Sequence, residues 1–109
     1  MQAFSLGQVN VVTPGTPVQV TTDATIRAQR IRFAAVIGQT GRTFVGLSGF
    51  NKTTGAGVLK ELWTTGVSGA IADEFWVEDL SGANGLQLSE YWVDANVANE
   101  DVMVAYWTK

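Results

Sequence analysis

The sequence predicts an all-β domain: an antiparallel β-sandwich or jelly roll of about eight short strands, with no substantial helix. Short runs rich in Val, Ile, Phe and Trp alternate with turn residues, as in antiparallel sandwiches. Twelve glycines divide the 109 residues into pieces that leave little room for a stable helix. Because there is no linker, repeat or low-complexity tract, we expect residues 1–109 to form a single domain, with residues 1–8 as an N-terminal arm.

Turn residues separate the expected strands in the first half of the chain. The Thr-Pro-Gly-Thr segment at 13–16 predicts a turn, because proline presets φ and glycine tolerates positive φ. Residues 27–37 alternate apolar side chains with Arg30 and Arg32, which gives one core face and one basic face. The glycine-bounded segment 38–41 predicts a hairpin turn into a returning strand. The expected strands are residues 9–12, 17–21, 27–37, 42–47, 58–63, 74–77, 86–88 leading into 91–95, and 101–107.

The last two strands, residues 91–95 and 101–107, are expected to form a closing hairpin that is apolar on both faces. A half-exposed strand alternates apolar with polar side chains, because successive residues point to opposite faces. Something must therefore cover the second face, and in so short a chain another subunit is a candidate. In the final strand one face carries Val102, Val104 and Tyr106, and the other carries Met103, Ala105 and Trp107.

Composition and charge exclude several classes of function. The chain contains neither histidine nor cysteine, so it lacks the residues for a disulfide, for a zinc site of the usual nitrogen and sulfur type, or for a Ser-His-Asp triad. The net charge of −3 and the scattered cations disfavour nucleic-acid binding. No apolar run is long enough to span a membrane, and the first residues lack the features of a signal peptide.

Three acidic pairs are the remaining candidates for acid–base chemistry or calcium binding. Neighbouring residues on a strand point to opposite faces, so the members of a pair do not converge by themselves. The spacing of a calcium loop is absent, and the glycine-rich segments 38–41 and 55–57 lack the lysine and helix of a phosphate loop. We therefore expect solvated charges and no catalytic, metal-binding or cofactor-binding residues; a glycosidase pair assembled across strands is the alternative. The pairs are Asp73/Glu74, Glu78/Asp79 and Glu100/Asp101.

Tryptophan and arginine side chains are the candidates for binding. Tryptophan is common in cores, at protein interfaces and on surfaces that stack sugars, so all three interpretations stay open for the four tryptophans. Exposure of Trp63 and Trp76 on one face would favour a sugar platform. A strip formed by Arg30 and Arg32 would suit an acidic partner, although an ordinary solvated strand face is the simpler explanation. The expected contact residues are Phe4 and Leu6 on the N-terminal arm, Arg30 and Arg32, and Trp92, Met103 and Trp107 on the second face of the closing hairpin.

The order of strands and turns carries a resemblance to a known group of proteins. It begins with Val-Val-Thr-Pro-Gly-Thr-Pro-Val-Gln-Val at 11–20, and continues with the strand at 30–35 and Thr-Gly-Arg-Thr-Phe-Val-Gly at 40–46. After a polar loop it ends with residues 86–95 and the strand at 102–106. Over most of residues 11–107 this order resembles the small virion proteins of tailed bacteriophages, the head decoration, auxiliary capsid or head-fibre proteins. Similar proteins commonly have a Pro-Gly turn before the strand at 74–77, where this chain has residues 67–72 instead.

The resemblance implies a non-enzymatic β-sandwich displayed on the outside of a capsid. Such a decoration, or cement, protein would be made in the host cytoplasm, bind the major capsid protein as a dimer or trimer, and reinforce the particle. No nucleic acid, membrane or cofactor is expected as a partner. A carbohydrate-binding or adhesin module of a phage tail or fibre is the alternative.

Overall fold

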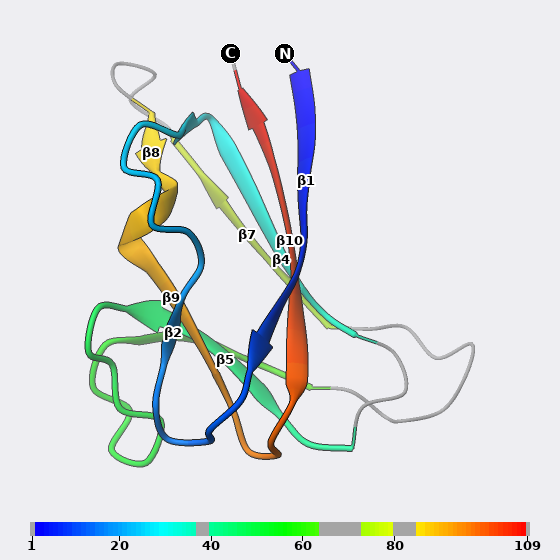
Figure 1. Cartoon of the computed structure of the whole chain (residues 1–109). Helices are drawn as coiled ribbons and strands as arrows, with labels where there is room; N and C mark the ends of the chain where they lie inside the picture. Colours follow the sequence, from blue (N-terminus) through cyan, green and yellow to red (C-terminus); the bar gives the residue numbers. More distant parts are fainter. Residues whose placement is uncertain (1, 37–39, 64–72, 80–84, 109) are drawn as a thin grey trace.

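Two four-stranded antiparallel sheets packed face to face form the protein (Figure 1). The computed structural model describes residues 2–36, 40–63, 73–79 and 85–108. The all-β prediction is confirmed. Within these residues the helical content is one 3-10 turn, η1 (Leu88–Glu90).

The described strands fall into two sheets and a short ladder. Sheet A has the order β1 (Gln2–Val11), β10 (Glu100–Thr108), β4 (Arg30–Ala35) and β7 (Glu74–Glu78). Sheet B has the order β2 (Val18–Gln19), β9 (Tyr91–Ala95), β5 (Thr43–Leu47) and β6 (Val58–Leu62). The ladder joins β3 (Arg27–Ala28) to β8 (Leu86–Gln87).

The pairing of strands identifies the sandwich as a jelly roll. Five pairs are nested along the chain: β1 pairs with β10, β2 with β9, β3 with β8, β4 with β7, and β5 with β6. Two further pairs, β10 with β4 and β9 with β5, join the nested pairs within each sheet. This is the pattern of a long antiparallel ribbon rolled into two sheets, as in jelly rolls. The sequence left sandwich and jelly roll open, and the strand order decides between them.

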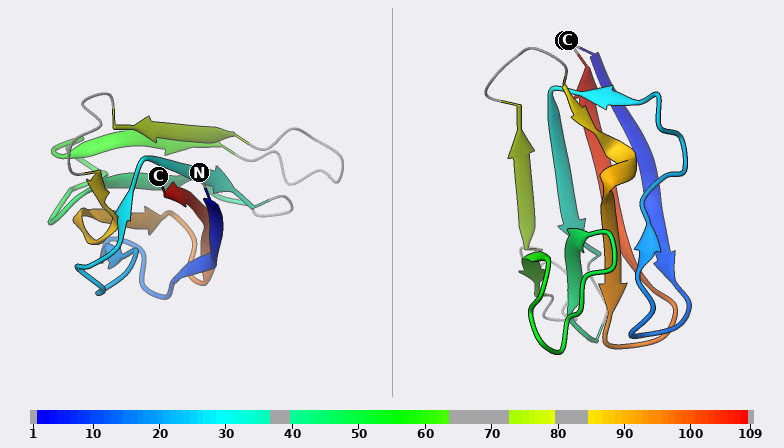
Figure 2. Two further views of the ribbon diagram at one scale, coloured as in Figure 1. Left: turned by 90° about the horizontal axis from the view of Figure 1, so that it is seen from above. Right: turned by 90° about the vertical axis from the view of Figure 1, so that its left-hand side faces the viewer.

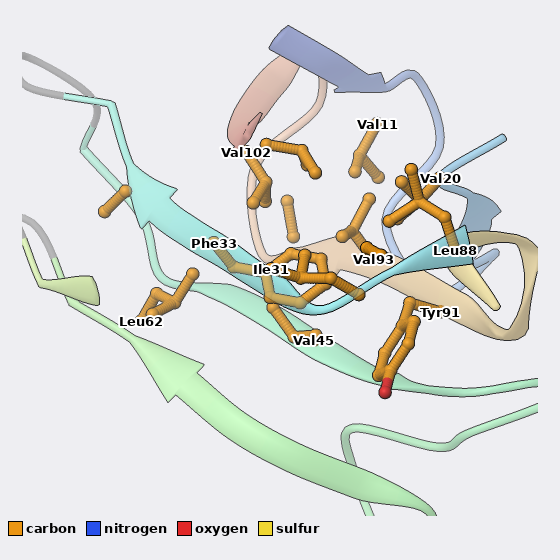
Figure 3. Packing of buried hydrophobic residues seen from close by; sticks show 14 residues of the cluster. Val11, Val20, Ile31, Phe33, Val45, Leu62, Leu88, Tyr91, Val93 and Val102 are labelled. Carbon is orange, nitrogen blue, oxygen red and sulfur yellow. The ribbon is translucent and has the colours of Figure 1, made fainter. Parts of the chain in front are cut away.

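The hydrophobic core lies between the two sheets (Figure 3). Phe33 of sheet A is fully buried and its ring centroid lies 5.6 Å from that of Tyr91 in sheet B. In β10, Val102 and Val104 point into the core and Met103 points out, since side chains alternate along a strand. The expected turn at 13–16 is confirmed by a hydrogen bond from the Thr16 N–H to the Thr13 carbonyl oxygen (3.1 Å).

Both expected hairpins are wrong. β4 and β5 lie in different sheets, as do β9 and β10, so each connection crosses the sandwich instead of joining paired neighbours. The physical reason is that turn residues mark where a chain reverses but do not determine whether the next strand pairs with the previous one. Residues 37–39 of the expected turn, and residues 67–72, lie outside the described residues. The segment expected as an N-terminal arm contributes residues 2–8 to β1, which pairs with β10 along its length.

Candidate functional site

The outer side of sheet A carries a row of large side chains. Partners in an antiparallel ladder point to the same side of a sheet. The register therefore places Ala105, Arg32 and Trp76 in one row of the outer side, and Trp107, Arg30 and Glu78 in the next. We call this surface the sheet A face; it consists of Arg30, Arg32, Trp76, Met103, Ala105 and Trp107, bordered by Glu74 and Glu78.

Two tryptophans of the sheet A face pack against each other. The ring centroids of Trp76 and Trp107 lie 5.1 Å apart with an interplanar angle of 31°. The Arg30 guanidinium carbon lies 5.3 Å from the centroid of the Trp76 ring, within the range of a cation–π contact. Trp76 is still 38% exposed and Met103 41%. The described part of the chain therefore leaves an aromatic and sulfur-containing surface open to solvent.

The arginines of the sheet A face are held by the glutamates at its border. Arg30 pairs with Glu78 and Arg32 with Glu74, each with a nitrogen–oxygen distance of 2.7 Å. Hydrogen bonds from Arg32 and Trp76 lower the pKa of Glu74 below its ordinary value, because they favour the ionised carboxylate. The arginine strip expected from the sequence is thus neutralised within the sheet and is not an excess of positive charge.

Four of the seven expected contact residues lie together on the sheet A face: Arg30, Arg32, Met103 and Trp107. The sequence prediction did not include Trp76 among the contact residues. The sequence did contain a signal that Trp76 faces outward. Trp76 alternates with the apolar residues Phe75 and Val77 and shares its side of the strand with two glutamates.

The two expected contacts near the N-terminus lie elsewhere. Phe4 stacks on Tyr106, with ring centroids 5.2 Å apart, and is 39% exposed. Phe4 pairs with Tyr106 in the ladder and therefore points to the same side of sheet A as Tyr106. This is the side of Val102 and Val104, opposite to that of Met103. Leu6, at the irregularity in β1, packs against the hydrophobic core.

Trp92 lies in sheet B, so the expected grouping of Trp92 with Met103 and Trp107 is wrong. The reason is the crossing between β9 and β10, which sends the two strands to different sheets. Trp92 lines a hollow of about 400 Å³ on the outer side of sheet B. The other lining residues are Gln19, Leu47, Ser48, Ser89 and Glu90.

A loop of the chain itself covers part of the outer side of sheet B. In the right-hand view of Figure 2, the orange strand β9 runs between this green loop, residues 48–57, and the blue strand β2. Phe50 of the loop is buried and packs over Gly46 of β5, where an added Cβ would lie 2.5 Å from the Phe50 ring. Glycine at this position is what lets the loop approach the sheet so closely.

A buried ion pair fastens the same region. Asp94 is 1% exposed and accepts hydrogen bonds from the Gly15 N–H (3.0 Å) and the Ala95 N–H (2.7 Å). The Lys52 ammonium lies 3.8 Å from Asp94 and donates to the carbonyl oxygen of Ala95. Asp94 thereby connects β9 to the 13–16 turn and to the 48–57 loop. A second hollow of about 360 Å³ is lined here by Gly15, Pro17, Gly49, Phe50, Asn51, Lys52, Thr53 and Asp94.

Trp63 and Trp76 belong to different sheets. Trp63 follows β6 of sheet B and is 52% exposed. The Arg42 guanidinium carbon lies 3.4 Å from its ring centroid, and Arg42 also pairs with Glu61 at 2.7 Å. The two-tryptophan platform considered from the sequence is therefore not formed by this pair. Trp76 has Trp107 as its aromatic neighbour instead.

The acidic pairs have structural partners. Glu100 is buried and accepts hydrogen bonds from the N–H groups of Thr40 (3.2 Å) and Gly41 (2.7 Å). Asp73 accepts a hydrogen bond from the Trp63 N–H (3.3 Å), next to the end of β6. Together with the Arg30–Glu78 pair, these contacts give the carboxylates roles in holding strands and turns.

Comparisons with protein-family models, with curated proteins and with solved structures give no match to this chain. Over the described residues, no three Asp or Glu side chains gather into a group that would hold a metal ion. The same residues include no helix with the length and apolar character needed to cross a membrane.

Proposed function

We propose that the protein is a non-enzymatic virion protein, a capsid decoration protein of a tailed bacteriophage that binds the outer capsid surface as an oligomer. The observation that carries the proposal is the sheet A face, where Trp76 and Met103 stay exposed beside Trp107. The resemblance of the strand and turn order to head decoration proteins supplies the setting. The major capsid protein is the proposed partner, and the capsid surface is the proposed location.

The composition of the sheet A face suits a protein–protein contact. Tryptophan, methionine and arginine are the residue types enriched at such interfaces. The arginines are already paired with Glu74 and Glu78, so docking would not strip water from an isolated charge. Burial of the apolar area would stabilise the contact by about 25 cal/mol per Å² before the entropic costs of association.

The size of the sheet A face supports binding as an oligomer. The face spans three strands, β10, β4 and β7, about 4.8 Å apart, with five or six residues along each, which gives a footprint of roughly 250 Å². A stable protein–protein interface buries about 800 Å² on each partner. One copy would therefore bind weakly, and a dimer or trimer on a symmetric capsid would gain affinity by simultaneous contacts.

Co-sedimentation with mature, undecorated capsids tests the proposal. The wild-type protein should bind saturably, and Met103→Glu should weaken the apparent affinity by roughly tenfold or more, since it places a charge in the centre of the contact. Leu59→Glu is the matched control, because Leu59 is as exposed as Met103 but lies on β6 of sheet B. Absence of saturable binding, or equal binding by the Met103→Glu protein, would contradict the proposal.

A carbohydrate-binding or adhesin module of a tail or fibre is the second candidate. The specific observation in its favour is the contact between the exposed Trp76 and the half-buried Trp107, flanked by Arg30 and Arg32 in fixed positions. Indole faces stack on the apolar faces of sugars, and the paired charges offer hydrogen bonds to hydroxyl groups. This candidate would be favoured over the first if the wild-type protein binds a glycan but no capsids, and if Trp76→Ala abolishes the glycan binding.

A further inference from the structure

The same two segments of the chain form the walls of both hollows on the outer side of sheet B. One wall is the segment 15–19, which contributes Gly15 and Pro17 to one hollow and Gln19 to the other. The opposite wall is the loop segment 47–53. Trp92 and Asp94 occupy alternate positions of β9 and so point to the same side. We call the two hollows together the β9 groove; one lies at Trp92 and the other at Asp94, about 7 Å apart along the strand.

The walls of the β9 groove are fixed by hydrogen bonds. The loop is closed by a bond from the Asn51 N–H to the Ala56 carbonyl oxygen (2.8 Å), and Lys52 ties it to Ala95 of β9. The opposite wall is tied to β9 through the Gly15 N–H and Asp94. A site with walls held in this way needs little ordering when a ligand binds, which reduces the entropic cost of binding.

The lining of the β9 groove combines apolar side chains with uncharged polar groups. Trp92 and Leu47 lie in one hollow, and Phe50 and Pro17 in the other. Around them stand hydroxyl and amide side chains that can both donate and accept hydrogen bonds. These side chains are Gln19, Ser48, Asn51, Thr53 and Ser89.

The charges around the β9 groove disfavour an anionic ligand. Lys52 is engaged with Asp94 and Ala95, and Glu90 lines the opposite end of the groove. An anionic ligand would meet the Glu90 carboxylate and a protein of net charge −3. An uncharged ligand with apolar ring faces and many hydroxyl groups matches both the rings and the polar groups.

We infer that the β9 groove is a binding site for a short neutral oligosaccharide, with the Trp92 indole stacking on a sugar ring. This inference goes beyond capsid decoration, because it concerns the sheet opposite to the sheet A face. A chain bound to a particle through sheet A would present the groove outward. Capsid binding and sugar binding would then be independent, and each can fail without the other.

NMR titration of isotope-labelled full-length protein with chitotetraose, cellotetraose, maltotetraose and mannotetraose tests the inference. At least one of these sugars should shift the Trp92 indole signal and the amide signals of 15–19 and 47–53. Ser48→Arg should reduce the affinity by roughly tenfold or more by filling the hollow, since Ser48 is exposed and its replacement leaves the core intact. Ala56→Arg is the control, because it adds the same charge to the same loop outside both hollows.

The other outcomes of the sugar titration contradict the inference. No shift with any of the four sugars would overturn it, as would shifts confined to Trp76 and Trp107. Binding that survives Ser48→Arg in a protein with an unchanged spectrum elsewhere would also overturn it. Shifts produced in the groove by an extended cationic peptide, with none from the sugars, would assign the groove to a protein partner. Capsid co-sedimentation of Ser48→Arg at the wild-type level would show that the decoration proposal stands separately.

Discussion

The two outer sides of the jelly roll differ in how far the chain itself covers them. On sheet B, the 48–57 loop folds back over β5, with Phe50 packed on Gly46 and Lys52 beside Asp94. On sheet A, Trp76 and Met103 stay exposed among surface ion pairs. The difference is that the described residues place a loop over part of the outer side of sheet B and no such loop over the sheet A face. The sheet A face is the one we propose for docking on the capsid.

The largest expected difference is in the free energy of unfolding that is lost when an ion pair is broken on each side. Lys52→Met should lower the free energy of unfolding by about 3 kcal/mol, because it leaves Asp94 as a buried charge without a cation. Arg30→Met, which breaks the exposed pair with Glu78 on sheet A, should cost less than about 1 kcal/mol. Urea unfolding of the two variants measures the contrast. Equal losses would show that the loop is not fastened by Lys52.

A smaller effect is expected from added methyl groups. Gly46→Ala should destabilise the protein by about 2 kcal/mol, because its Cβ would lie 2.5 Å from the Phe50 ring and 2.7 Å from the Gly57 carbonyl oxygen. Hydrogen exchange should become faster in the 48–57 loop, since the loop must move away from the sheet. Ala105→Val on the sheet A face is the control and should be nearly neutral. Wild-type stability of the Gly46→Ala protein, with an unchanged rate of hydrogen exchange in the 48–57 loop, would contradict the close packing of this loop on sheet B.

The smallest effect concerns the pH dependence of the sheet A face. Arg32 lowers the pKa of Glu74, so this pair stabilises the fold above the ordinary glutamate value of 4.5, and the contribution is lost as pH falls through the pKa of the folded protein. Arg32→Gln should raise the pKa of Glu74 towards 4.5 and make the protein slightly less sensitive to acid. Carboxyl NMR titration of Glu74 measures this change. An unchanged pKa would mean that the pair is absent in solution.

Much of the fold was predictable from the sequence, because alternation and turn residues act locally. The turn at 13–16 follows from such patterns. The strand expected over 27–37 is divided in the structure into β3 (Arg27–Ala28), which pairs with β8, and β4 (Arg30–Ala35). The crossings between sheets were not predictable in this way, since they depend on which distant strands pair. The long β1 was underestimated because Gln2, Ser5, Gly7 and Gln8 break the apolar pattern, and the strand is held by its pairing with β10.

The candidate site was predictable only in part. Arg30, Arg32, Met103 and Trp107 come together because they share the outer parity of adjacent strands. Trp92 could not be separated from them without knowing that β9 belongs to the other sheet. The β9 groove was not predictable, because its walls come from segments 15–19 and 47–53 that no local pattern connects.

Oxidative footprinting of the free protein and of protein bound to undecorated capsids tests the central claim most directly. The account predicts that Met103 and Trp76 are oxidised readily in the free protein and become protected on the particle. Trp92, in the β9 groove of sheet B, should react at the same rate in both states. Protection of Trp92 with continued oxidation of Met103 and Trp76 on the particle would contradict the assignment of sheet A as the docking face.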